Sequence, residues 1–61
     1  MYKVGQQVLV IKASRDDVRE GLKSDLICEV TQISNSNNFM TISPIGRTSQ
    51  HVVHTDQVRK F

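Results

Sequence analysis

Several residue types that mark common protein classes are scarce in this chain. It contains one cysteine (Cys28), one proline, three glycines and no tryptophan. A single cysteine can form neither an internal disulfide nor a structural zinc site, and this fits a reducing, cytoplasmic setting. Three isolated glycines form no phosphate-binding loop and exclude a collagen-like chain. An aromatic content of 5% argues against proteins that stack bases or proline-rich peptides on aromatic side chains.

Long hydrophobic segments are missing as well. No apolar run approaches the roughly 20 residues of a membrane-spanning helix, and the first apolar stretch is too short for a secretory signal. We therefore expect a cytoplasmic protein that does not contact a membrane. With 61 residues, of which 38% are hydrophobic, the chain predicts one small domain spanning 1–61. Its core is expected to be marginal, because a chain of this length buries only about 60% of its unfolded surface.

The charged residues are unevenly distributed along the chain. Residues 1–30 carry five basic and five acidic side chains, whereas residues 31–61 carry three basic and one acidic. The net charge of +2 therefore resides in the C-terminal half. This basic excess is thin beside the dense stripe that is typical of nucleic-acid-binding proteins.

The dominant pattern is short stretches of β-forming residues separated by turn residues. Strands are predicted over 6–12, 25–33, 39–43, 50–54 and 58–61. Both faces of the first are apolar, which indicates a strand that is covered on both sides or bent at a corner. The inward-facing residues predicted for the first three strands are Val8, Val10, Leu26, Cys28, Val30, Met40 and Ile42. Strands near five residues in length predict an all-β, antiparallel fold.

Two polar segments separate the first three strands. The long loop, about 13–24, contains Ser14 and Asp17 at the spacing of a capping box, and Gly21 is typical of a helix end. One helical turn is predicted there. The short loop, 34–38, is rich in serine and asparagine and predicts a tight turn.

The residues that could take part in catalysis or metal binding are not spaced for either role. His51 and His54 are three residues apart in a predicted strand, so they point to opposite faces and cannot chelate one ion together. We expect both histidines to be partly exposed. Cys28 lies in the middle of an apolar strand face, which favours a buried thiol over a nucleophile. The sequence predicts no enzyme activity, no cofactor and no metal.

Two stretches of the chain carry a resemblance to a known family. The opening YKVGQQVLV, at 2–10, resembles the x-x-G-x-x-V-x-V start of many small prokaryotic and bacteriophage SH3-like and KOW-type domains. The segment HVVHTDQVRK, at 51–60, resembles their last strand, single 3-10 turn and closing strand, with Thr55 or Asp56 expected to cap the turn. The resemblance implies an SH3-like, partly open five-stranded antiparallel barrel with one short helical turn in the long loop.

The resemblance also implies a function in binding. In such domains the long and short loops flank one groove, with the turn after the fourth strand at its base. A non-enzymatic module of a bacterial or bacteriophage accessory protein, docking onto a larger protein through these loops, is the expected function. Loops of mixed charge give orientation-specific contacts to a protein partner. The predicted protein-binding residues are Arg15, Asp16, Asp17, Arg19, Glu20, Asn37, Asn38 and His54.

Two further interpretations are open. The first is a KOW-like nucleic-acid-binding domain with a C-terminal basic patch, whose contacts would be to phosphates and sensitive to salt. Its predicted residues, which the meeting of the chain ends would gather on one side, are Lys3, Arg47, Arg59 and Lys60. The second concerns oligomeric state, which is expected to be a monomer or a weak homodimer, because a small core gains stability from a partner chain.

Overall fold

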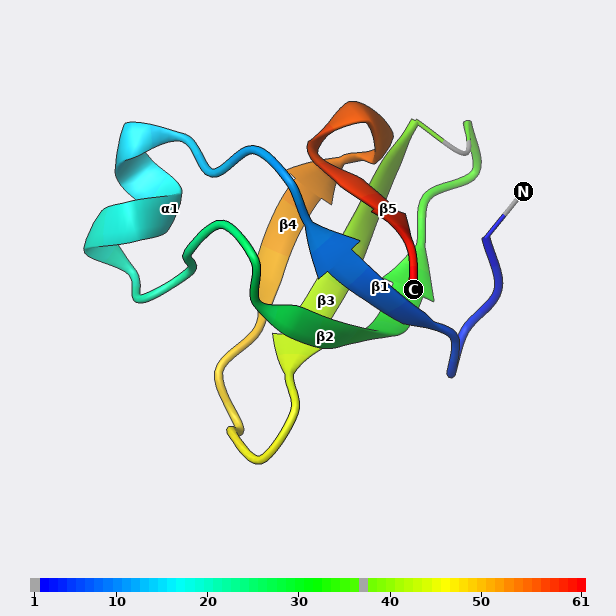
Figure 1. Cartoon of the computed structure of the whole chain (residues 1–61). Coiled ribbons are helices and arrows are strands. Elements are labelled where there is room, and N and C mark those ends of the chain that lie inside the picture. The colour runs from blue at the N-terminus through cyan, green and yellow to red at the C-terminus, as the bar shows by residue number, and fades with distance from the viewer. Residues whose placement is uncertain (1, 37) are drawn as a thin grey trace.

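The computed structural model describes residues 2–36 and 38–61, which form an antiparallel five-stranded sheet with two short helical segments (Figure 1). The strands are β1 (Gln7–Val10), β2 (Ile27–Ile33), β3 (Phe39–Pro44), β4 (His51–His54) and β5 (Val58–Lys60). The spatial order is β4-β3-β2-β1-β5. The prediction of an all-β, antiparallel fold is confirmed, and each strand ends within one or two residues of its predicted bounds.

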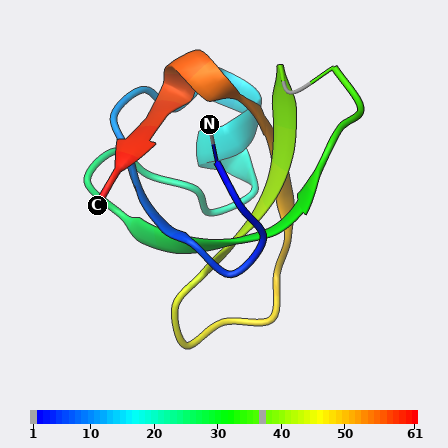
Figure 2. The ribbon, with the colours of Figure 1, turned by 90° about the vertical axis from the view of Figure 1, so that its right-hand side faces the viewer.

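The sheet curves around an interior that receives side chains from all five strands (Figure 2). Alternate residues point inward, as the two-residue period of a strand requires. The buried apolar residues are Val8, Val10, Leu22, Cys28, Val30, Met40, Ile42, Val53 and Val58. The inward residues predicted for β1, β2 and β3 are among them, except Leu26, which is half-buried and packs against the core. The outer face of β1 is only partly covered, since Leu9 is half-buried.

The helix α1 (Arg15–Arg19) lies in the long loop and begins at the predicted capping box. The Ser14 Oγ accepts a hydrogen bond from the Asp17 N–H at 3.1 Å, and the Asp17 Oδ2 accepts one from the Ser14 N–H at 3.0 Å. Gly21 follows the helix with a φ of +98°, in the left-handed region that favours glycine. A helix of five residues is too short to be stable alone, so tertiary contacts must hold it in place.

The 3-10 turn η1 (Thr55–Gln57) joins β4 to β5, but its cap differs from the prediction. His54 caps the turn: its Nδ1 accepts a hydrogen bond from the Asp56 N–H at 3.1 Å, and its own N–H donates to the Gln57 Oε1 at 2.9 Å. The expectation that Thr55 or Asp56 caps this turn is therefore wrong. The imidazole of the preceding residue already satisfies the open backbone N–H.

Candidate functional site

The turn η1 makes hydrogen bonds to both loops. On one side, the Gln57 Nε2 donates to the Asp17 Oδ2 at 2.9 Å and to the Lys12 carbonyl at 3.0 Å, immediately before the long loop. On the other side, the Thr55 N–H donates to the carbonyl of Asn38, in the short loop, at 3.0 Å. The structure thus joins two loops that are distant in sequence to one three-residue turn.

Asp17 lies inside this arrangement and is 8% exposed. Burial by itself raises the pKa of the Asp17 carboxyl, but hydrogen bonds from Ser14 and Gln57 and the neighbouring His51 outweigh it, and the pKa lies below its ordinary value of 3.8. Asp17 is one of the predicted protein-binding residues. Its carboxylate instead ties the long loop to η1, and a partner has little access to it.

The other charged residues predicted for binding are exposed on or beside α1. They are Arg15, Asp16, Arg19 and Glu20. Because α1 is tied to η1 through Asp17, these side chains extend from a backbone of defined position. Near the short loop, Asn38 is exposed and His54 is half-buried, whereas Asn37 lies outside the described residues.

Phe39 lies beside His54 and is exposed like most of the predicted binding residues of the two loops. It was not among the binding residues predicted from the sequence. It is 47% exposed, and its ring meets the His54 imidazole edge to face, with centroids 5.2 Å apart. The contact arises from strand pairing, which sets Phe39 opposite His54. Exposed aromatic residues are enriched in protein interfaces. The outward position of an aromatic residue at the start of a predicted strand is the signal that could have identified it.

The two histidines of β4 have different surroundings. His51 is 4% exposed, so the expectation that both histidines are partly exposed is wrong for this one. Strand alternation turns His51 inward with Val53, and its Nδ1 lies 3.5 Å from the Glu20 Oε2. Neither ring nitrogen has a hydrogen-bond partner in the described part of the chain. Within those same residues, no group of three histidine, cysteine or acidic side chains is placed to hold a metal ion.

Cys28 is fully buried in β2. Burial raises the pKa of its thiol above the ordinary value of 9.0. A thiol that stays protonated is a poor nucleophile, and its reactivity is further limited by the lack of solvent access. Cys28 therefore packs as a small apolar side chain, in the position that the strand pattern predicted.

The four residues of the basic alternative do not all face one side of the molecule. Arg59 and Lys60 are consecutive in β5, so their side chains point to opposite sides of the strand. Arg47 follows β3, and its guanidinium donates to the Gly21 carbonyl of the long loop at 3.4 Å. Lys3 is exposed and follows Tyr2, whose hydroxyl donates to the Val58 carbonyl of β5 at 3.3 Å, so the two chain ends lie close together. The separation within the group is that Arg59 and Lys60 point apart and that Arg47 contacts the long loop.

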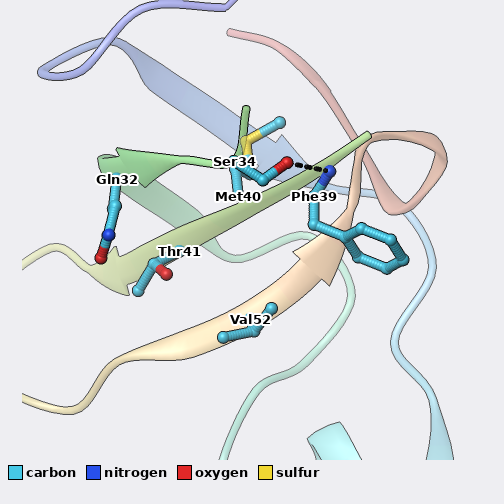
Figure 3. Close-up of a pocket in the computed structure, with 6 residues that line it drawn as sticks. All are labelled: Gln32, Ser34, Phe39, Met40, Thr41 and Val52. Atoms are coloured by element: carbon cyan, nitrogen blue, oxygen red, sulfur yellow. Dashed lines mark hydrogen bonds between the residues drawn. The ribbon is translucent and has the colours of Figure 1, made fainter. Parts of the chain in front are cut away.

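A shallow hollow lies on the outer face of β2, β3 and β4 (Figure 3). Its volume is about 160 Å³, below the roughly 300 Å³ at which small-molecule sites begin. The lining residues are Gln32, Ser34, Phe39, Met40, Thr41 and Val52. The hollow is a depression in an uncharged surface next to the short loop.

Comparison of the chain with known protein families, curated proteins and solved structures gives no match. Neither helical segment of the described chain has the length or apolar character needed to cross a bilayer.

Proposed function

We propose that this protein is a small, non-enzymatic binding module of SH3-like architecture that docks onto a larger protein. The docking surface consists of side chains around η1, all exposed except the half-buried His54: Arg15, Asp16, Arg19, Glu20, Asn38, Phe39 and His54. The observation that carries the proposal is the pair of contacts from η1, Gln57 to Asp17 and Thr55 to Asn38, which unite the two loops. A role as a bacterial or bacteriophage accessory protein follows from the family resemblance.

The charges of the docking surface suit a protein partner. On or beside α1 there are two basic residues, Arg15 and Arg19, together with two acidic residues, Asp16 and Glu20. Mixed signs select a partner whose charges have the complementary arrangement, and they fix its orientation. A surface for nucleic acid would instead present basic residues of one sign to the phosphates.

The other side of η1 supplies apolar contact and rigidity. Phe39 offers an exposed ring that is supported by His54. Both loops are hydrogen-bonded to η1, so less conformational entropy is lost when a partner binds than would be lost by free loops. The docking surface thus combines specificity from charge with apolar area from an aromatic residue.

Affinity capture with charge-reversed variants tests this proposal. Immobilised protein is incubated with a nuclease-treated bacterial lysate, and the partner identified by mass spectrometry is then purified for binding measurements. The double variant R15E/R19E should bind that partner at least tenfold more weakly, a change of about 1.4 kcal/mol. The variant K3E/K60E is the matched control, because it changes the net charge equally away from the docking surface.

Two outcomes would contradict the proposal. The first is that R15E/R19E binds the purified partner as tightly as the wild type does. The second is that only nucleic acid is captured from an untreated lysate and is released by salt, which would favour the basic alternative.

A further inference from the structure

The outer face of β2, β3 and β4 carries few charged side chains: Glu29 of β2 is exposed opposite Ser43 at one end of the β2–β3 ladder, near Arg47. From residue 30 to residue 55 the chain contains a single lysine, arginine, aspartate or glutamate, Arg47, and it lies between β3 and β4. Gln32, Thr41 and Val52 lie on neighbouring strands of this face (Figure 3). Val52 is 68% exposed. We call the area formed by Gln32, Thr41, Val52 and Phe39 the neutral face. The cores of protein interfaces are likewise depleted of charged residues and rich in apolar ones.

The strand β4 forms one edge of the sheet and pairs only with β3 among the described strands. Natural edge strands are commonly protected by lysine, by proline or by a bulge that turns the edge away. The four residues of β4, with the sequence HVVH, include neither lysine nor proline, and the β3–β4 register has no bulge. An edge of this kind is a template for another strand.

The β3–β4 ladder determines which backbone groups of β4 face outward. At its end the Thr55 N–H donates to the Asn38 carbonyl at 3.0 Å, so this pair is hydrogen-bonded. Bonded and non-bonded pairs alternate along an antiparallel ladder. The N–H and C=O groups of Val52 and His54 therefore point to the free edge rather than to β3.

One of these outward groups is already used. The His54 N–H donates to the Gln57 Oε1 at 2.9 Å, which limits strand pairing at this end of β4. The N–H and C=O of Val52 are left as the central open pair of the edge. A partner strand must therefore be centred on Val52.

We propose that the occupant of this edge is a second copy of the same chain, paired antiparallel through β4 to give a symmetric dimer. With Val52 opposite Val52 of the second copy, each N–H donates to the other carbonyl, and both open pairs are satisfied at once. The same symmetry places the two neutral faces on one side of a continuous sheet. The four residues of β4 include no lysine, arginine, aspartate or glutamate, so this pairing brings no like charges opposite each other across the two-fold axis.

The dimer is expected to be weak. A stable interface buries about 800 Å² on each partner, which is nearly a fifth of the 4239 Å² surface of this chain. Pairing through four residues of β4 covers less than that, so association should depend on concentration. The neutral face and β4 share Phe39 and His54 with the proposed docking surface, so the two proposals are tested with different variants, V52K for the dimer and R15E/R19E for docking.

Disulfide trapping tests the register directly. Opposed residues of a hydrogen-bonded pair have Cα atoms about 5.5 Å apart, within the usual range for a disulfide. We expect Val52→Cys to form a covalent dimer under mild oxidation at least tenfold faster than Val18→Cys. Val18 is the matched control because it is 56% exposed but lies on α1, and the buried native Cys28 should not compete.

Sedimentation velocity provides the second measurement. Over about 10 μM to 1 mM, the wild type should shift from monomer to dimer, whereas Val52→Lys should stay monomeric and keep the wild-type circular dichroism spectrum. Equal trapping rates for the two cysteine variants, a wild type that is monomeric throughout, or a V52K protein that still dimerises would overturn the proposal. The variant V52K keeps the charged residues of α1. Its oligomeric state therefore tests this inference, whereas its binding to the captured partner tests the proposed function.

Discussion

Asp17 takes part both in the capping box of α1 and in the contact between α1 and η1. Its carboxylate accepts a hydrogen bond from the Ser14 N–H at 3.0 Å, which starts α1, and another from the Gln57 Nε2 at 2.9 Å, which joins α1 to η1. Hydrogen bonds to a charged group contribute about 1.5–3 kcal/mol. The first bond follows from a spacing of three residues and was predicted. The second joins residues 40 positions apart, and no local pattern indicates it.

Replacing Asp17 should make the free energy of unfolding depend less on pH in the acidic range. The pKa of Asp17 is lowered in the folded protein, so its stabilising effect is fully present above its ordinary pKa and is lost as the pH falls through the lowered value. We expect Asp17→Asn to reduce the free energy of unfolding by about 1–2 kcal/mol at pH 7. The difference from the wild type should shrink at about pH 2.5, as measured by urea denaturation at both pH values.

The neighbouring Asp16 provides the control for this measurement. It is also acidic and in the first turn of α1, but it is exposed. Asp16→Asn should change the free energy of unfolding by less than about 0.5 kcal/mol. An Asp17→Asn difference that stays constant between the two pH values would be inconsistent with the role assigned to the charge.

At the scale of the element, η1 holds together the two loops of the proposed docking surface. The strand and turn pattern predicted this element and its position, but not its cap or its contacts. Capping by His54 depends on the rotamer of an imidazole, and Gln57 contacts two segments, at Asp17 and Lys12, that are far away in sequence. The element was therefore predictable, whereas its function in holding the loops was not.

Removing the Gln57 side chain should loosen the long loop without unfolding the sheet. In Gln57→Ala the hydrogen bonds to Lys12 and Asp17 are lost, together with the one accepted from the His54 N–H within the turn. The helix α1 is too short to persist without tertiary contacts. We expect backbone amide hydrogen exchange in residues 13–24 to accelerate about tenfold, corresponding to about 1.4 kcal/mol of local stability. Amides of β2 and β3 should keep most of their protection.

Gln32→Ala is the matched control for Gln57→Ala, because Gln32 is exposed on β2. It should leave exchange in the long loop unchanged. Exchange in 13–24 that is the same in Gln57→Ala and the wild type would show that other contacts hold α1.

At the scale of the whole molecule, the long loop is part of the core. Leu22 belongs to a segment that the sequence assigns to a polar excursion, yet it is among the fully buried side chains. Its apolar side chain is surrounded in sequence by Gly21 and Lys23, so no alternation marks it as internal. The interior of this small, curved sheet also contains apolar volume from outside the strands, which Leu22 of the long loop supplies.

Truncating Leu22 should therefore destabilise the whole molecule. Leucine-to-alanine changes in cores cost about 2–5 kcal/mol, and a protein of this size has roughly 3–9 kcal/mol of total stability. We expect Leu22→Ala to be largely unfolded or close to its midpoint at 37 °C by circular dichroism. Ile45→Ala, at a site that is 53% exposed, should melt within a few degrees of the wild type, and the same result for Leu22→Ala would contradict its place in the core.

The sequence by itself determined the properties that depend on neighbouring residues. The two-residue alternation of apolar side chains predicted the strands and most of their inward residues, and the spacing of Ser14 and Asp17 predicted the start of α1. These succeed because strand orientation and capping are set by bonds within a few residues.

Only the tertiary structure decided the properties that depend on contacts between distant segments. The burial of Leu22 and His51, the bond from Gln57 to Asp17 and the contact between Phe39 and His54 all join residues from different elements. Side-chain burial is set by what packs on top of a residue, and the residues that do so here are far away in the chain. The resemblance implied that the turn after β4 lies between the two loops, whereas the hydrogen bonds by which η1 holds both loops became visible only in the folded protein.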